Sequence, residues 1–349
     1  MRVDIIDQWA EFDALAEDWD DVYAADEQAH LFVSWRWLRT CLQLSPHRWF
    51  VLVARRTADD HAVAFLPLAS WRGSWRRVGV TRHLQMGGKP LSEYTGFLCH
   101  PDHETTALQA FARVLLDDLG WEYFHLDDVM DSRLDRFLSC FQGSSCAIKQ
   151  RSSLPCARIQ LAPSWEQYLQ DSLGRESRRT LRKILRKFES LEKLCMTRVG
   201  PEDFDRQLDI LLAMWQDRHG KHEAALERHR RFLQETFAAG HLWLNMAWID
   251  ESPVAGLASF VDPVKKSLYT FLTAYNPRYA EVSPGLAIYG ETIREAIANG
   301  IEHFDFLRGA PNYKTTRLGG TVRPAETVLL AHGHPWLRSL RNRWTLNPD

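Results

Sequence analysis

The sequence lacks the short motifs that mark several common kinds of catalytic or metal site. Its six cysteines form no Cys-x-x-Cys pair and no Cys/His spacing typical of zinc, so we expect reduced thiols and no metal. Neither a Gly-x-Ser-x-Gly elbow nor a Gly-x-x-x-x-Gly-Lys-Ser/Thr loop is present. The formal net charge is only -2, so any site for a polyanion must be a local one.

Long apolar runs are absent as well. No segment approaches the roughly 20 apolar residues of a membrane span, and Asp4 and Asp7 interrupt the start, where a signal peptide needs an apolar stretch. We therefore expect a cytoplasmic protein. Residues 334–344 mix apolar and basic side chains at helical spacing, which predicts a terminal helix that is docked on its own domain or touches the inner membrane surface peripherally.

The length of 349 residues, with 45% apolar and 25% charged residues, favours two globular domains. Periodicity and turn residues in the first half predict helices at 9–23 and 32–44, strands at 49–54, 62–68 and 75–86, a helix at 104–119 and a strand at 122–126. In the second half they predict helices at 164–191, 202–219 and 226–239, strands at 241–249, 254–261 and 267–275, a helix at 283–299 and a strand at 302–306.

The two halves repeat one order of elements. Residues 120–126 match 300–306 at an offset of 180 residues, and residues 62–66 match 253–257 at an offset of 191. Each pair of segments occupies the same place in the order of strands and helices. Because a fixed-offset similarity of this kind exposes duplicated architecture, we predict two copies of one fold.

The most informative segment opens a helix with Ser283-Pro284-Gly285. A proline at the first helical position loses no hydrogen bond, and Gly285 lets a ligand approach the backbone. The free N–H groups and the helix dipole would then favour a pyrophosphate. A simple helix cap is the alternative interpretation.

The strand that follows ends near residue 308 and contains Asp305 between two phenylalanines. Its carboxylate is a candidate general base, while Arg308, Tyr313 and Lys314 are candidates for binding anionic groups or supplying a proton. Ligands of open α/β sheets bind beyond the carboxyl ends of strands, which favours this place. The alternative is a buried Asp–Arg pair that fixes the strand end.

A basic helix in the second half carries seven Arg and Lys residues between 175 and 187. Arg178, Arg182 and Arg186 are four residues apart and would form a stripe able to meet phosphate on a nucleotide tail, a lipid or RNA. A solvated face is the alternative.

These motifs, in this order, resemble the FemAB/CelD-like branch of the GNAT acyltransferases. The resemblance rests on the Arg-rich stretch 178–183 followed by Val254-Ala255, Tyr269, Ser283-Pro284-Gly285, Gly300, 304–306, Arg308-Gly309 and Tyr313-Lys314. It implies an α/β fold of two tandem GNAT-like domains, each a mixed, mainly antiparallel sheet flanked by helices. It also implies a donor that is acyl-CoA, or an aminoacyl-tRNA in FemAB relatives, and an amine acceptor.

The resemblance implies roles for individual residues. Asp305 would take the amine proton, and Tyr313 or Lys314 would protonate the departing thiolate or anchor the acceptor. The residues expected to bind the donor are Ser283, Gly285, Leu286 and Arg308. Those expected to bind substrate are Arg178, Arg182, Tyr269 and Tyr275. Acyl-CoA would be a co-substrate, and we expect no tightly bound cofactor. The usual GNAT pyrophosphate loop, a basic residue followed by spaced glycines, does not precede this helix.

Serines and prolines near 150–163 interrupt the pattern, so we expect domains at 1–155 and 156–349. The first copy has no helix-opening Pro-Gly, and His125 stands in the place of Asp305. We therefore expect a degenerate first domain on the acceptor side and a second domain that binds the donor and carries catalysis.

The function expected from these features is N-acyl transfer from acyl-CoA to an amine, in envelope polysaccharide or lipid synthesis. One alternative is a FemAB-like transferase that depends on aminoacyl-tRNA, with the basic helix on the RNA. Another is a non-catalytic binding or scaffold protein of envelope biosynthesis.

Overall fold

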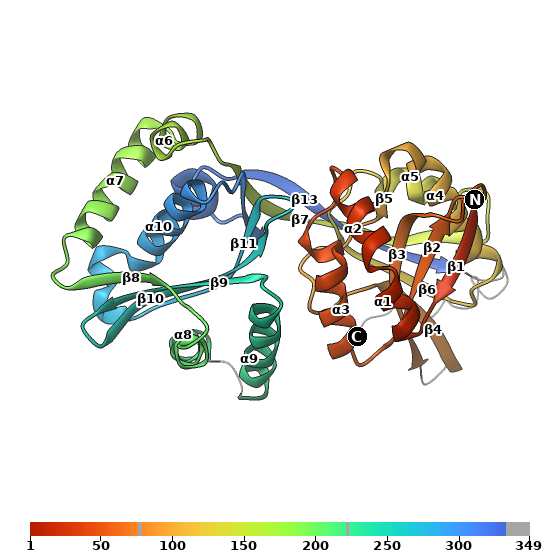
Figure 1. Ribbon diagram of the computed structural model, residues 1–349, viewed down its shortest axis with the longest axis horizontal. Coiled ribbons are helices and arrows are strands. Elements are labelled where there is room, and N and C mark those ends of the chain that lie inside the picture. Colours follow the sequence, from red (N-terminus) through yellow and green to blue (C-terminus); the bar gives the residue numbers. More distant parts are fainter. Residues whose placement is uncertain (76–78, 221–222, 333–349) are drawn as a thin grey trace, which may run out of the picture. The chain divides into compact units, whose positions relative to one another are not determined.

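The computed structural model describes residues 1–75, 79–220 and 223–332 (Figure 1), and the helix expected at 334–344 lies outside them. The chain forms two compact units. Unit 1 holds residues 1–154 and the part of the chain from Pro324 onward, and unit 2 holds Pro155–Arg323.

Unit 1 is a sheet with helices on both faces. Its helices are α1 (Trp9–Ala14), α2 (Ala16–Ala25), η1 (Leu31–Val33), α3 (Trp35–Leu44), η2 (Pro101–His103), α4 (Glu104–Asp117) and α5 (Leu134–Ser139). Its strands follow the order β1 (Arg2–Ile6), β2 (Arg48–Arg55), β3 (Ala62–Trp75), β4 (Gly79–Met86), β6 (Tyr123–Val129) and β13 (Thr321–His332), and β5 (Leu98–Cys99) pairs with β3.

Unit 2 repeats this arrangement. Its helices are α6 (Trp165–Ser172), α7 (Arg175–Glu189), α8 (Phe204–His219), α9 (Glu223–Ala238), η3 (Pro277–Val282), α10 (Pro284–Ala298) and η4 (Tyr313–Arg317). Its strands follow the order β8 (Leu194–Arg198), β9 (Leu242–Ile249), β10 (Ser252–Asp262), β11 (Ser267–Tyr275), β12 (His303–Arg308) and, from Pro155 onward, β7 (Cys146–Gln160).

The two sheets share one pairing pattern. Within each unit, neighbouring strands are antiparallel except β4 with β6 and β11 with β12, and each parallel pair is joined over only three residue pairs. Tyr123 pairs with His83 as His303 pairs with Ser267, so the 180-residue offset of the sequence is also the structural offset. The predicted fold class, two tandem and mainly antiparallel sheets flanked by helices, is confirmed.

The outer neighbour of each parallel pair comes from the other half of the chain. β6 pairs with β13, and β12 pairs with β7. Residues 156–349 were expected to form one domain, but those from Pro324 onward in β13 lie in unit 1, because they complete its sheet beside β6.

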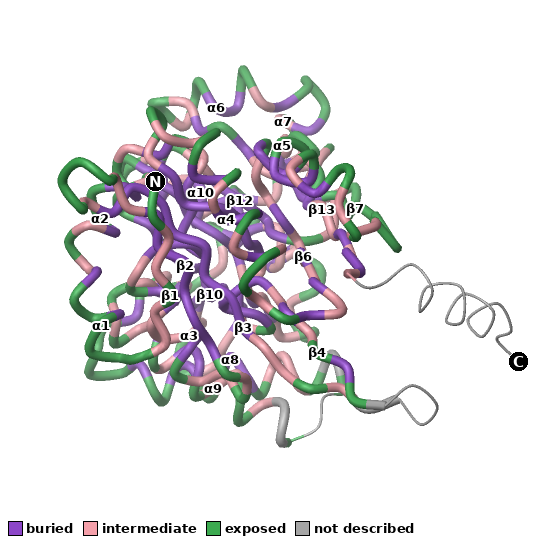
Figure 2. The backbone as a smooth tube through the Cα atoms, turned by 90° about the vertical axis from the view of Figure 1, so that its right-hand side faces the viewer, coloured by how far each residue is buried: buried purple, intermediate pink, exposed green. Residues whose placement is uncertain are grey.

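Unit 1 has two hydrophobic cores, one on each face of its sheet, and alternating residues of a strand belong to one or the other. Leu52 and Phe124 lie with α4 and α5, whereas Val51 and Phe65 lie with α1, α2 and α3. Buried residues therefore concentrate in the strands, while the helices are exposed on their outer sides (Figure 2). In unit 2, α7 and α10 pack against Phe304 of β12.

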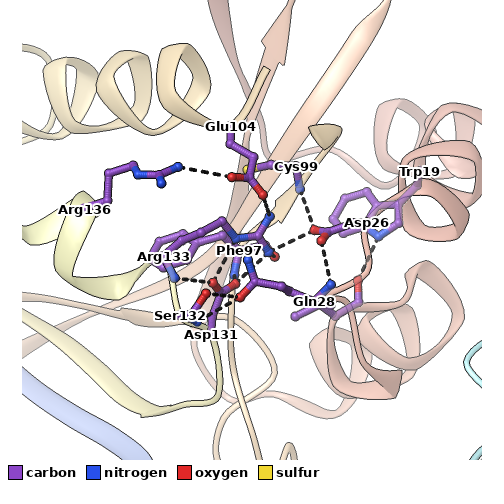
Figure 3. Close-up of polar contacts among 11 residues, drawn as sticks. Trp19, Asp26, Gln28, Phe97, Cys99, Glu104, Asp131, Ser132, Arg133 and Arg136 are labelled. Carbon is purple, nitrogen blue, oxygen red and sulfur yellow. Dashed lines mark hydrogen bonds and ion pairs between the residues drawn. The ribbon is translucent and has the colours of Figure 1, made fainter. Parts of the chain in front are cut away.

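A buried ion cluster ties several elements of unit 1 together (Figure 3). The Arg133 guanidinium, at the start of α5, lies 2.9 Å from Asp26 after α2 and 2.8 Å from Asp131, and all three side chains are 2% exposed. A further ion pair joins Arg133 to Glu104 of α4, and Asp26 accepts the backbone N–H of Cys99. Burial alone would lower the pKa of Arg133, but Asp131 and Asp26 raise it above its usual range. The cluster thus holds a permanent cation where three elements meet.

Candidate functional site

Unit 2 contains a pocket of about 340 Å³ beside the start of α10. It is formed by the end of β11, the end of η3, the first turns of α10 and the start of η4, with the lining residues Thr273, Tyr275, Ala280, Ser283, Pro284, Gly285, Leu286, Tyr289 and Tyr313. Five of the residues singled out in the sequence therefore come together here, namely Tyr275, Ser283, Gly285, Leu286 and Tyr313.

The pocket lies where two parallel strands part. β11 pairs with β12 only from Ser267 to Tyr269, and β11 continues to Tyr275 without that partner. On its other side, β10 pairs Ala258 with Leu272 and Ser259 with Thr270, so Phe271 is the extra residue of a β-bulge. A bulge leaves a residue outside the ladder, and this one lies two residues before Thr273, which lines the pocket.

The start of α10 presents one free backbone donor. Ser283 adopts the left-handed region (φ 53°), and its carbonyl accepts the N–H groups of both Leu286 and Ala287 at 3.0 Å. Pro284 has no N–H, so in the part of the chain that the structure describes Gly285 has the N–H of this turn without a backbone acceptor. The dipole of α10 adds to its attraction for an oxygen of a ligand.

Gly285 also packs closely against a neighbouring ring. A Cβ atom there would lie 3.3 Å from Cδ1 of Tyr275, so the tyrosine ring lies directly against the helix start. The rings of Tyr289 and Tyr313 are 6.0 Å apart. None of the described lining residues is charged. The pocket therefore suits a neutral group that accepts hydrogen bonds, such as a thioester.

Asp305 lies outside this pocket and is engaged elsewhere. Its side chain is 1% exposed, Oδ1 accepts the N–H of Leu307 at 2.7 Å, and Oδ2 lies 2.5 Å from the Arg323 guanidinium. Since Phe304 and Phe306 belong to the core beside α10, Asp305 points to the opposite face of the strand. This arrangement is the buried Asp–Arg pair considered as the alternative, with Arg323 as the partner, and it does not support Asp305 as a base at the pocket.

Lys314 holds the end of β12. Its Nζ donates to the carbonyl oxygens of Phe306 at 2.8 Å and of Arg308 and Gly309 at 3.1 Å. An ammonium group has three hydrogens to donate, and this geometry directs them to the backbone rather than to a leaving thiolate. Lys314 therefore positions Tyr313, whereas the Arg308 side chain is exposed and does not line the pocket.

Tyr269 does not line the pocket either. Burial, with the nearby carboxylates of Asp262 and Asp305, raises the pKa of its phenol above the usual range. The side chain is 4% exposed and stays neutral at physiological pH.

The basic face of α7 differs in detail from the predicted stripe. Arg178 donates to the carbonyl of Leu173, Arg182 pairs with Glu166, and Arg186 donates to the carbonyl of Arg182. The exposed row consists instead of Arg175, Arg179 and Lys183. Arg179 and Lys183 each lie two residues from Leu181, or about 200° around the helix, so they point away from this buried position.

Pocket residues that the sequence analysis missed include Thr273, Ala280 and Tyr289. Tyr289 follows Gly285 by one helical turn and so faces the same side. Its aromatic ring fits the apolar pattern of a core helix, which hides its place in the pocket.

Comparison with known proteins identifies one domain in this chain and several structures of similar fold. Residues 175–315 match the model of the acetyltransferase (GNAT) domain. FemX has a TM-score of 0.66 to this structure at 11% identity, over 93% of this chain and 98% of that one. No curated protein has a significantly similar sequence.

Two further solved structures resemble the whole chain. L-PGS from Bacillus licheniformis has a TM-score of 0.55 at 12% identity, over 98% of both chains. The tandem GNAT protein from the clavulanic acid biosynthesis pathway has a TM-score of 0.52 at 11% identity, over 96% of this chain and 99% of that one. At such identities the likeness is one of fold.

Residues 175–315 thus match an acetyltransferase (GNAT) domain, and the whole chain shares its fold with FemX and with a tandem GNAT protein. In this chain the acetyltransferase (GNAT) domain lies within unit 2, which also holds the pocket. The resemblance noted in the sequence is thereby confirmed.

No helix among the described residues is long and apolar enough to cross a membrane. Within the same residues, no group of three or more His, Cys, Asp or Glu side chains is arranged to hold a metal ion.

Proposed function

We propose that the chain is an N-acyltransferase that moves an acyl group from acyl-CoA to an amine, with the donor thioester in the pocket of unit 2. One observation carries this proposal: the end of β11 beyond its pairing with β12 and the free N–H of Gly285 coincide at a neutral pocket. An envelope polysaccharide or lipid precursor is the acceptor class that we propose.

The transfer is direct in this proposal. The amine nitrogen attacks the thioester carbonyl carbon, and the developing oxyanion meets a backbone N–H beside the bulge. The C–S bond then breaks, the Tyr313 phenol gives its proton to the sulfur, and it recovers through water the proton that the nitrogen loses. Lys314 keeps Tyr313 in place through the three carbonyl oxygens that it binds.

The proposal is tested with a panel of acyl-CoAs in thermal unfolding and in turnover with amine acceptors. A ligand at 100 times its dissociation constant stabilises the folded protein by about 2.7 kcal/mol, so binding is visible as a raised Tm. Saturable stabilisation and release of free thiol are expected. A flat panel without thiol release would contradict the proposal and favour the scaffold alternative.

A second candidate donor is the aminoacyl-tRNA that the FemAB resemblance implies. The exposed cations of α7 favour it, because they suit a polyanion and the pocket itself is neutral. Binding of aminoacyl-tRNA that weakens steeply with salt, together with no response to acyl-CoA, would favour this donor.

A further inference from the structure

The pocket offers little to the charged part of an acyl-CoA or aminoacyl-tRNA donor. Its described lining residues are all neutral, and the first turn of α10 has a single free N–H, at Gly285, because Leu286 and Ala287 both bond to the Ser283 carbonyl. A single backbone N–H binds a pyrophosphate weakly, because pyrophosphates are usually bound by several N–H groups. The phosphates of a donor must therefore find other partners.

The cations that could serve lie on α7. Its fifteen residues contain seven Arg and Lys and two Glu, and Glu189 is taken by an ion pair with Arg294. Arg175, Arg179 and Lys183 are exposed and form no ion pair within the described parts of the chain. They occupy successive turns, so the row is about 12 Å long at 1.5 Å per residue.

The helix that carries this row packs against the elements that line the pocket, with the row itself on its outer, exposed face. α7 packs closely against α10 (Figure 1), where a Cβ atom at Gly290 would lie 3.0 Å from the side chain of Leu185. At its C-terminal end, Lys187 donates to the carbonyl of Glu281, which is two residues before Ser283. α7 also contacts η3 and η4, which supply Ala280 and Tyr313 to the pocket.

The geometry points to α7 as the site that holds the phosphate groups of the donor, with Arg175, Arg179 and Lys183 as their counter-charges. Resting on the proposed function, this inference divides the donor between two surfaces. The neutral acyl thioester or ester enters the pocket, and the anionic part lies along α7. Arginine suits such a role because its planar guanidinium binds phosphate with two hydrogen bonds.

The test compares two charge-matched variants of the full chain. One carries Arg175→Gln, Arg179→Gln and Lys183→Gln on α7, and the other carries Arg206→Gln, Arg228→Gln and Arg231→Gln on α8 and α9, where the side chains are also exposed. The first probe is adenosine 3′,5′-bisphosphate, the nucleotide end of CoA, measured by calorimetry. The second is a labelled tRNA, measured by anisotropy over a range of salt concentrations.

We expect the α7 variant to bind the responding probe about tenfold more weakly, since three exposed charge pairs together have that effect, and the control variant to stay within about twofold of the natural chain. A response to the bisphosphate assigns the row to a CoA-type donor, and a response only to tRNA assigns it to an RNA donor. Equal binding by the α7 variant and the natural chain in both assays would overturn the inference.

Turnover separates this inference from the proposed function. With acetyl-CoA and acetyl-pantetheine as donors, the α7 variant should raise KM for the phosphorylated donor alone. If the α7 variant turned over acetyl-CoA with an unchanged KM, the phosphate site on α7 would be rejected and the proposed transferase activity would stand. If a probe bound in a way that depends on α7, but no donor were turned over, the proposed transferase activity would be rejected and the phosphate site would stand.

Discussion

At the scale of single residues, Tyr313 brings a phenol to the pocket, and its neighbour in the chain, Lys314, is fixed by three backbone carbonyl oxygens. In Tyr313→Phe we expect kcat to fall by about 10²- to 10³-fold, because a positioned acid contributes that much to catalysis. The Tm should not change, since the ring is kept. Turnover and thermal unfolding measure the two effects.

Tyr275→Phe is the matched control, because it removes a hydroxyl from the same pocket. We expect this variant to change KM more than kcat. An equal loss of kcat in both variants would mean that Tyr313 does not act as the acid.

Asp305 leads to the opposite expectation. Asp305→Asn removes the ion pair with Arg323, which is one-third exposed, so we expect a loss of about 1–3 kcal/mol in the free energy of unfolding. Turnover per folded molecule should survive. Arg323→Gln should show the same loss, because it breaks the same pair, and an Asp305→Asn protein of full stability without turnover would restore Asp305 as the base.

Local sequence signals found part of this site. The residue types of Ser283-Pro284-Gly285 predict a helix start, and this prediction does not depend on contacts between distant parts of the chain. The partner of Asp305 is Arg323, which lies 18 residues further along the chain on another strand. That pairing depends on how β13 is placed, which no local pattern reveals.

At the scale of elements, a row of rings crosses the sheet of unit 1. Trp71, His83 and Tyr123 are register partners on β3, β4 and β6, with ring centroids 5.0 and 5.1 Å apart. Nδ1 of His83 lies 3.0 Å from Nε2 of His125. Burial lowers the pKa of both histidines, and the proximity of His125 lowers that of His83 further.

Stability should therefore depend on pH. The unfolded chain takes up protons at about pH 6.5, whereas the folded chain keeps these rings neutral to a lower pH. The stabilisation is thus complete above about pH 6.5 and falls as the pH decreases. Urea unfolding at pH 7.5 and 5.5 measures it, and His83→Gln should flatten the dependence. His61→Gln, outside the row, should not, and an unchanged slope in His83→Gln would contradict the assignment.

The predicted elements match the structure where the pattern is strong. Both hairpins, the helix between the parallel strands and the strands after Gly120 and Gly300 are present in each unit. The edge strands β1 and β8 were missed, because five residues at a sheet edge carry little alternation. The bulge at Phe271 was missed as well, since it depends on the register against β10.

At the scale of the whole molecule, the sequence predicted the duplication but not the exchange of outer strands. Similarity within the chain reveals which segments are equivalent, and β6 and β12 were recognised in this way. It does not reveal which strand pairs beside them. β13 completes unit 1 although about 190 residues separate it from β6, and its inward-facing residues Val328 and Leu330 belong to the core of that unit.

This exchange can be tested by asking which unit responds when β13 is weakened. Leu330→Ala deletes a side chain that is 2% exposed, so we expect a loss of about 2–5 kcal/mol. Hydrogen exchange should then show lower protection in β6 and α4 of unit 1, while β10 and α10 of unit 2 keep theirs. Val322→Ala, on the same strand but 56% exposed, is the control and should leave both units unchanged. Lower protection in unit 2 alone would mean that β13 belongs there, as the division at 155/156 predicted.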